Sequence, residues 1–181
     1  MRCVELELAG VLVIEPEVFH DDRGFFLETY NRQRYAVLPG LDQEFVQDNY
    51  SHSKRGVLRG LHLQCRRPQG KLIRALTGRI WDVAVDVDPR SSTFRKWVAV
   101  ELDGDNRKQL YIPPGYAHGF CVLSESADVE YKCTALRDPG DEAGIRWDDA
   151  ALAIVWPVNV PILSERDRNN PALEEYLRGR E

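Results

Sequence analysis

The sequence predicts an all-β fold, a sandwich or jelly roll of two facing sheets with a few short helices. Gly, Pro, Asp or Asn interrupts the 181-residue chain about every 8 to 12 residues, and short runs rich in Val, Ile, Leu and aromatic residues lie between these interruptions. Helical periodicity is scarce, with short candidates only at 31–38 and 171–179. Many short, evenly spaced strands favour two sheets that bury their inner faces and leave one end open to a ligand.

The strand candidates follow one another along the whole chain. In residues 80–88, IWDVAVDVD, tryptophan and valines at odd positions face one way, whereas Asp82, Asp86 and Asp88 face the other. We expect one face to be core and the other to be wet or to line a cavity. Thr77 and Gly78, between two strand-like runs, predict a tight hairpin. Further strand candidates are 11–19, 24–30, 44–52, 57–64, 95–103, 109–123 and 128–136.

The composition is that of an ordinary globular chain, and we expect one domain over residues 1–181. Hydrophobic residues make up 43% and charged residues 29%, and no apolar run approaches the roughly 18 residues that suggest a membrane span. The first ten residues mix charges among apolar positions and lack a signal-peptide core. These features predict a cytoplasmic protein without a membrane partner.

Charge and cysteine usage exclude two further classes. The net charge is -5 and the basic residues are scattered singly, whereas binding a nucleic-acid backbone requires clustered Lys and Arg. Duplex nucleic acid is therefore not expected as a partner, while a small anionic ligand suits the pattern. The cysteines at positions 3, 65, 121 and 133 form no CxxC pair and no close cysteine-histidine spacing, which argues against a zinc knot or a redox motif. They are interpreted as free thiols.

The segment 57–64, VLRGLHLQ, places polar groups inside an apolar run. His62 could be a metal ligand, a proton-transfer group or a buried imidazole that is hydrogen-bonded to the backbone. In a regular strand Gly60 and His62 share one face and Arg59 belongs on the other. Gly60 can accommodate a bulge that turns both Arg59 and His62 into a cavity, and an arginine there is hard to bury without an anion.

A catalytic metal would need about three firm protein ligands. The chain has His62-Leu63-Gln64 in place of an HxH pair, no Glu in the next few residues, and only His118 as a distant imidazole. Two imidazoles and an amide are a poor ligand set for zinc or iron. We therefore expect no metal at His62.

Other polar residues occur in similar strand contexts. Gln47 and Asn49 lie two apart and share a face, with amides suited to a pyrimidine or a sugar hydroxyl. Lys71 opens a strand, and Tyr131 shares its face with apolar positions two residues away on either side. Taken singly, Gln47 and Asn49 fit an exposed strand face, Lys71 a solvated strand end and Tyr131 a core edge. Taken together with His62, they favour a ligand-binding cavity.

Six segments spread over nearly the whole chain match a known protein family. Three of them are FVQDNYSHSKRGVLRGLHLQ at 45–64, YIPPGYAHGFCVLS at 111–124 and LSERD at 163–167. The others are 10–31, 70–89 and 131–134. Taken in their order along the chain, the six segments resemble the dTDP-4-dehydrorhamnose 3,5-epimerases, the RmlC-type sugar epimerases. The resemblance implies a cupin-type double-stranded β-helix jelly roll, a homodimer without metal or other cofactor, and a dTDP-sugar substrate.

The resemblance also implies residue roles. It makes His62 the general base, Tyr131 the general acid and Asp167 the carboxylate that hydrogen-bonds the histidine, and it places Lys71 near the keto oxygen of the sugar. The remaining substrate-binding positions are Arg23, Glu28, Gln47, Asp48, Asn49, Arg59, His118, Arg137, Glu142 and Arg166, with Arg23 and Glu28 near the dimer interface.

Two positions depart from the family's usual residues. Arg137 stands where the family often has an aromatic residue that stacks on thymine, and a guanidinium plane can also stack on a base. Arg166 stands where the family often has lysine, a change that keeps the charge and alters the geometry. Neither change affects the expected proton-transfer residues.

The implied activity is the inversion of C3 and C5 of dTDP-4-dehydro-6-deoxy-D-glucose to give dTDP-4-dehydro-L-rhamnose, on the path to dTDP-L-rhamnose and lipopolysaccharide. Three alternatives remain open at this point. One is a mono-epimerase acting at C3 or C5 alone, the second is a metal-dependent isomerase or oxygenase of the same fold, and the third is a non-catalytic module that binds nucleotide sugars.

Overall fold

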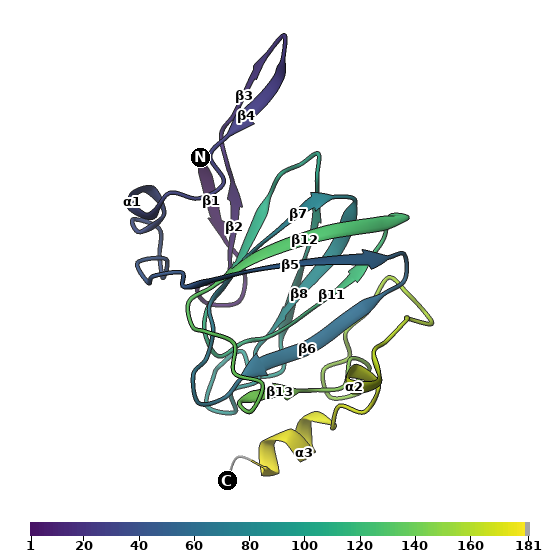
Figure 1. Cartoon of the computed structure of the whole chain (residues 1–181). Coiled ribbons are helices and arrows are strands. Elements are labelled where there is room, and N and C mark those ends of the chain that lie inside the picture. Colours follow the sequence, from purple (N-terminus) through teal and green to yellow (C-terminus); the bar gives the residue numbers. More distant parts are fainter. Residues whose placement is uncertain (180–181) are drawn as a thin grey trace.

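The computed structural model describes residues 1–179, so the last two residues of the expected domain, 180 and 181, lie outside the described range. Two antiparallel sheets face one another, as in a jelly roll (Figure 1). In spatial order, the six-stranded sheet contains β1 (Arg2–Glu5), β2 (Leu12–Glu15), β10 (Gln109–Ile112), β7 (Lys71–Thr77), β12 (Ser126–Cys133) and β5 (Gln47–Lys54). The five-stranded sheet contains β13 (Glu142–Gly144), β6 (Leu58–Gln64), β11 (Ala117–Val122), β8 (Arg79–Val85) and β9 (Trp97–Asp103). The all-β prediction is confirmed.

Prolines divide two of the expected strands. Residues 11–19 form β2 and β3 (Val18–Asp21) on either side of Pro16, and residues 109–123 form β10 and β11 around Pro113 and Pro114. Proline cannot donate a ladder hydrogen bond, which explains why pairing stops there. Strands β1 and β13 were not predicted.

The corner at Gly78 is not the expected hairpin. Strand β7 ends at Thr77 and β8 begins at Arg79, but the two strands belong to different sheets. Gly78 has a φ of +69°, and a Cβ there would lie 2.0 Å from the carbonyl oxygen of Ser126. The prediction of a hairpin was wrong because glycine here lets the chain cross from one sheet to the other.

Hydrophobic side chains cover both faces of the five-stranded sheet. Ile80, Ala84 and Phe120 pack between the sheets, whereas Val83 and Val85 pack beneath the C-terminal segment. Asp82 points to the inner side, is fully buried and lines no cavity within residues 1–179, so the expectation that this face of residues 80–88 is wet or lines a cavity was wrong at this position. The pattern within one strand cannot show that a distant segment covers its other face.

Three short helices accompany the sheets: α1 (Arg32–Tyr35), α2 (Glu165–Arg168) and α3 (Leu173–Arg178). The first and third lie within the predicted helical segments, and α2 was not predicted. Within residues 1–179 no helix is both long enough and apolar enough to cross a membrane.

The hairpin of β3 and β4 (Gly24–Leu27) projects away from the two sheets (Figure 1). Its exposed side chains include Phe19, Phe25 and Phe26, with relative exposures of 54%, 53% and 70%. Phe19 and Phe26 are register partners on one face of the hairpin and form an exposed apolar pair of the kind that marks interaction sites, whereas Phe25 lies on the other face beneath the guanidinium of Arg107.

Candidate active site

A cavity of about 550 Å³ lies between the two sheets and is closed on one side by residues around α2. Polar side chains from several strands point into it. Of the residues predicted from the sequence, it brings together Asn49, Arg59, His62, Lys71, His118, Tyr131, Arg137, Glu142, Arg166 and Asp167. Segments that are far apart in the chain therefore build one site.

A bulge in β6 explains how two neighbouring polar residues both reach the cavity. His62 pairs with His118 and Arg59 pairs with Phe120, so β6 advances three residues while β11 advances two. Gly60, between them, has a φ of +123°, and a Cβ there would lie 2.6 Å from the Cα of Gly119. The predicted bulge is confirmed, since both Arg59 and His62 line the cavity.

His62 and Asp167 form the tightest polar contact in the cavity. Nε2 of the imidazole lies 2.5 Å from Oδ1 of Asp167, and Ser164 Oγ donates to Oδ2 of the same carboxylate at 2.9 Å. Burial raises the pKa of Asp167, but the hydrogen bonds from His62 and Ser164 outweigh this effect and hold the pKa below its usual value. The ionised carboxylate can only accept, so Nε2 carries the proton and Nδ1 of the neutral ring carries the free lone pair.

Helix α2 aims this carboxylate. Ser164 caps the helix, because its hydroxyl accepts from the backbone N–H of Asp167 at 3.0 Å. Asp167 is 4% exposed, and its buried carboxylate accepts two hydrogen bonds, one from His62 and one from Ser164. Ser164 was not among the predicted site residues; the signal that could have found it is a serine directly before a short acidic and basic run in LSERD.

Lys71 is a buried cation in the cavity wall. It is 9% exposed, and within residues 1–179 its ammonium group has no hydrogen bond or ion pair. Burial lowers its pKa, an effect that nearby Cys133 and Glu142 partly oppose. The interpretation of Lys71 as a solvated strand end was therefore wrong. An ammonium group without a partner in a cavity favours a ligand oxygen that carries negative charge.

Tyr131 lines the cavity from β12, in the sheet opposite to that of His62. It is half-buried and has no hydrogen-bond partner for its hydroxyl within residues 1–179. Burial raises the pKa of the phenol, and Cys133 and Glu142 add to this shift. The hydroxyl therefore stays protonated at neutral pH and can donate a proton across the cavity.

His118 is fixed by a carboxylate that sequence reasoning did not name. Its Nε2 lies 3.0 Å from each oxygen of Asp82, and both side chains are buried. Burial lowers the pKa of His118, and Asp82 opposes that shift. The signal for this pair was the aspartate in the strand pattern of residues 80–88, which was expected to be wet or to line a cavity.

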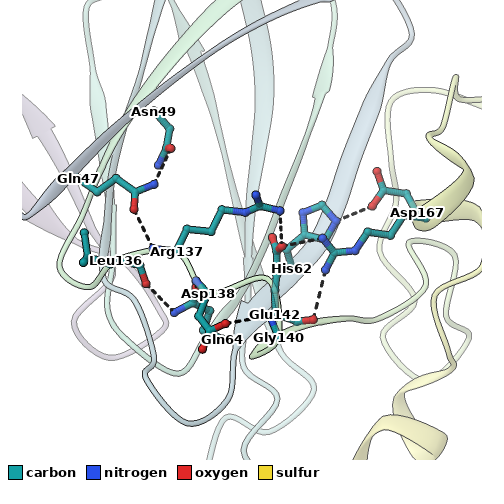
Figure 2. A network of polar contacts seen from close by, with 11 residues as sticks. Gln47, Asn49, His62, Gln64, Leu136, Arg137, Asp138, Gly140, Glu142 and Asp167 are labelled. Atoms are coloured by element: carbon teal, nitrogen blue, oxygen red, sulfur yellow. Dashed lines mark hydrogen bonds and ion pairs between the residues drawn. The ribbon is translucent and has the colours of Figure 1, made fainter.

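Arg137 and Arg166 converge on one carboxylate oxygen. Oε2 of Glu142 accepts from Arg137 at 2.8 Å and from Arg166 at 2.7 Å. Figure 2 shows Arg137 reaching toward Glu142 beside the His62 and Asp167 pair. Burial raises the pKa of Glu142, but the two arginines outweigh it and lower the pKa. Two guanidinium groups around one carboxylate leave a surplus positive charge at the cavity.

Gln47 lies outside the cavity and supports Arg137 instead. Its Oε1 accepts from the backbone N–H of Arg137 at 2.7 Å, and its amide donates to Asn49 at 2.8 Å (Figure 2). Gln64 fastens the same loop, since it accepts from the backbone N–H of Asp138 at 2.8 Å. Arg137 thus extends from a loop whose backbone is held in place.

Besides Gln47, three more predicted binding residues lie away from this cavity within one chain. Asp48 is exposed and pairs with Lys132 at 2.8 Å. Arg23 lies on the projecting hairpin, where it pairs with Asp21, and Glu28 follows that hairpin and accepts from Asn31 at 3.0 Å. The cavity lining also includes residues that were not predicted: Tyr50, Ser51, Val57, Leu58, Gln69, Phe120, Ile162, Leu163 and Ser164. All nine are uncharged, and apart from Ser164 nothing in their local sequence distinguishes them from ordinary strand or loop residues.

Residues 1–179 contain no group of three or more His, Cys, Asp or Glu side chains arranged to hold a metal ion. The two imidazoles in the cavity, His62 and His118, each have a carboxylate on Nε2.

Known proteins resemble this chain over nearly its whole length. A family model described as dTDP-4-dehydrorhamnose 3,5-epimerase matches residues 5–175. The dTDP-4-dehydrorhamnose 3,5-epimerase of Methanothermobacter thermautotrophicus is 48% identical over 96% of this chain and 95% of that protein. The crystal structure of dTDP-6-deoxy-D-glucose-3,5-epimerase RmlC from Legionella pneumophila, in complex with dTDP-4-keto-L-rhamnose, has a TM-score of 0.93 and 45% identity, covering 96% of this chain and 93% of that one. A dTDP-4-dehydrorhamnose 3-epimerase of Streptomyces niveus is 38% identical over 97% of this chain and 85% of that protein.

Proposed function

The chain belongs to the dTDP-4-dehydrorhamnose 3,5-epimerase family, and on this premise we propose that it inverts both C3 and C5 of dTDP-4-dehydro-6-deoxy-D-glucose. The product is dTDP-4-dehydro-L-rhamnose, a precursor of dTDP-L-rhamnose, and the enzyme is an isomerase. The observation that carries the proposal is His62 on one sheet, hydrogen-bonded to Asp167 of α2, with Tyr131 and Lys71 on the other sheet across the cavity.

The chemistry begins at the C4 ketone, which acidifies the hydrogens on C3 and C5. Removing one of them creates an enolate, and returning a proton to the opposite face of the carbon inverts it. A site for this reaction needs a base on one side of the sugar ring, an acid on the other, and positive charge near the developing oxyanion. These are proton transfers, so the proposed steps involve no redox change.

His62 supplies the base in this proposal. Asp167 holds the proton on Nε2, which leaves the lone pair of Nδ1 for abstraction from carbon, and the same carboxylate stabilises the imidazolium that results. Tyr131 supplies the acid from the opposite sheet, since its phenol is protonated and its hydroxyl has no partner within residues 1–179. The two groups then address opposite faces of a sugar ring between the sheets.

Lys71 stabilises the enolate. Its ammonium group lies in the same sheet as Tyr131, is buried, and is not engaged by another side chain. A preorganised cation in a site from which water is excluded lowers the barrier more than one in bulk water would, because nothing has to reorganise when the negative charge develops. Its lowered pKa also eases donation of a proton toward the oxyanion.

The arginines provide the binding of the nucleotide diphosphate. Arg59 lines the cavity with a guanidinium that is held by Ser53 at 3.0 Å, and the Arg137–Glu142–Arg166 cluster adds surplus positive charge. Planar guanidinium groups bind diphosphate oxygens through charge-assisted hydrogen bonds. Asn49 and His118 remain as neutral polar partners for the sugar or the base.

Deuterium exchange tests the reaction directly. In deuterated water, the enzyme is expected to place label at both C3 and C5 of the dTDP-4-dehydro sugar, because each inversion passes through an enolate that is reprotonated from solvent. Mass spectrometry and NMR of the product distinguish the two carbons. Label at one carbon alone would instead favour a mono-epimerase, the activity named for the less similar Streptomyces niveus relative. No label at all would refute the epimerase proposal.

We also propose a homodimer formed through the β3–β4 hairpin. The exposed phenylalanines on the hairpin would be covered by a second copy, and Arg23 and Glu28 would then lie at the interface, where the resemblance puts substrate-binding residues. Sedimentation equilibrium is expected to give twice the mass of the chain, and the variant Phe26→Asp should shift the population toward monomer. A wild-type mass equal to that of one chain would contradict the dimer.

The cellular setting is proposed on narrower grounds. All four cysteines are free, as expected in a reducing compartment, which supports the cytoplasm. The use of the product in lipopolysaccharide stays a prediction.

A further inference from the structure

The contact between Gly144 and Asn170 lies directly behind the proposed catalytic pair. Gly144 ends β13 and is the register partner of His62 on the neighbouring strand β6. Asn170 follows Asn169, the C-cap of the helix that carries Asp167. One contact therefore joins the strand next to the base and the turn that carries its carboxylate.

The contact leaves no room for any side chain at position 144. A Cβ on Gly144 would lie 2.1 Å from Oδ1, 2.4 Å from Cγ and 2.6 Å from Nδ2 of Asn170. Real Cβ atoms essentially never approach another heavy atom within 3.0 Å, and all three nearest atoms belong to this one amide. The φ angle of Gly144 is not in the left-handed region, so its backbone conformation suits any residue. Glycine is required here by Asn170 and not by a turn.

Asn170 is held in this position by packing. Its Nδ2 is buried and makes no hydrogen bond within residues 1–179. A buried amide nitrogen without a partner is costly, so a sequence retains it only where its volume or position matters. Asparagine has only two side-chain torsions, so its amide group, whose Nδ2 is buried, has little room to move away from Gly144 except together with its own backbone.

The segment around the contact is tied at both ends. Before α2, the backbone N–H of Leu58 donates to Ile162 at 3.0 Å, and after it the backbone N–H of Arg146 donates to Pro171 at 2.8 Å. Between these ties, two contacts join the α2 segment to β13 at the sheet edge. Arg166 donates to the side chain of Glu142 at 2.7 Å and to its carbonyl at 3.3 Å, and these long side-chain bonds can stretch or turn. The Asn170 amide lies directly against the Cα of Gly144 and limits how closely the segment approaches the strand.

We propose that Gly144 and Asn170 are positioning residues that set the spacing between the edge of the five-stranded sheet and α2, and thereby the hydrogen bond from His62 to Asp167. Neither residue lines the cavity, so neither touches the substrate. The catalytic consequence rests on the proposed function, whereas the geometric consequence does not. A side chain at position 144 pushes Asn170 outward and draws Asp167 away from the imidazole.

The variant Gly144→Ala tests this proposal with two readouts. A displacement of about 1 Å in a catalytic group can cost about 100-fold in rate, so kcat is expected to fall about 100-fold while KM changes little. The His62 ring N–H that donates to Asp167 is expected to give a downfield resonance in proton NMR spectra of the wild type. In the variant this resonance is expected to shift or disappear. Gly179→Ala is the matched control, because a Cβ there meets ordinary contacts of 3.6 Å at the end of α3.

Compensation separates positioning from general damage. In the double variant Gly144→Ala/Asn170→Gly, all three clashing atoms are gone. We therefore expect kcat to return to within a few-fold of the wild-type value, and the ring N–H resonance to return close to its wild-type position. Should Gly144→Ala fail to fold, Asn170→Gln presses on the same contact from the other side and is expected to give the same loss of kcat. A wild-type kcat and an unchanged resonance in Gly144→Ala or Asn170→Gln, or a loss that the double variant does not relieve, would overturn the proposal. Failure of the epimerase proposal would show differently, as a wild-type enzyme that exchanges no deuterium.

Discussion

Replacing His62 by alanine is expected to slow deuterium exchange at C3 and C5 by about 10²- to 10⁴-fold, the usual contribution of a positioned general base. The variant leaves Asp167 in place but removes the only nitrogen that this carboxylate orients toward the cavity. Because Lys71 and Arg59 are untouched, the nucleotide should still bind. The measurement is exchange in deuterated water, followed by NMR, together with calorimetric titration of dTDP.

His52→Ala is the matched control for this prediction. His52 also hydrogen-bonds an aspartate, with Nδ1 2.8 Å from Asp128, but it is exposed on β5 and does not line the cavity. Exchange at the wild-type rate in His62→Ala would remove His62 from the role of base. Equal losses in both histidine variants would indicate damage to the fold instead of loss of the base.

Tyr131→Phe is expected to reduce net inversion by about 10²- to 10⁴-fold and to affect the first deprotonation much less. The phenol lies across the cavity from His62, so its removal leaves abstraction intact while the enolate lacks a donor on its other face. The enolate should then recover its proton from the side of His62, which returns label to unchanged substrate. The ratio of labelled substrate to inverted product measures this partition.

A second tyrosine provides the comparison for Tyr131. Tyr50 also lines the cavity, but its hydroxyl donates to Asp128 at 2.7 Å, so it has no proton to offer the substrate. Tyr50→Phe is therefore expected to keep the wild-type ratio of exchange to inversion. If Tyr131→Phe lost exchange and inversion to the same extent, an acid role for Tyr131 would be untenable. Because the pKa of Tyr131 is raised, its donor role should persist at pH values above the usual range of a phenol.

Local sequence was informative wherever local chemistry decides the structure. Alternation and proline breaks predicted most strands, and Gly60 predicted the bulge that turns Arg59 and His62 into the cavity. The roles of Tyr131 and Asp167 needed the family resemblance, because they lie on different strands and helices and no spacing along the chain links them to His62.

The errors share a different cause, which is dependence on a distant segment. Gly78 has the composition of a hairpin turn, and only the placement of β7 and β8 in separate sheets makes it a corner. Asp82 is buried because His118 arrives from another strand. Helix α2 has four residues, too few for helical periodicity, and it is stabilised by its serine cap and its contact with the sheet.

The two departures from the family's usual residues also become intelligible in space. Arg137 and Arg166 are far apart in the sequence, yet both donate to the same oxygen of Glu142. Because both arginines donate to the same carboxylate, a change at either one alters the surroundings of the other, and the two have to be considered together. No reading of either position alone could have indicated this.

The placement of the base on one sheet and of the acid on the other has a wider implication. The layer of aliphatic side chains between the sheets, which includes Ile73, Ile80 and Val129, acts as a spacer for the reaction as well as a core for the fold. A substitution there that thickened or thinned this layer would change the separation of His62 and Tyr131, and with it how efficiently an enolate formed on one side is reprotonated from the other.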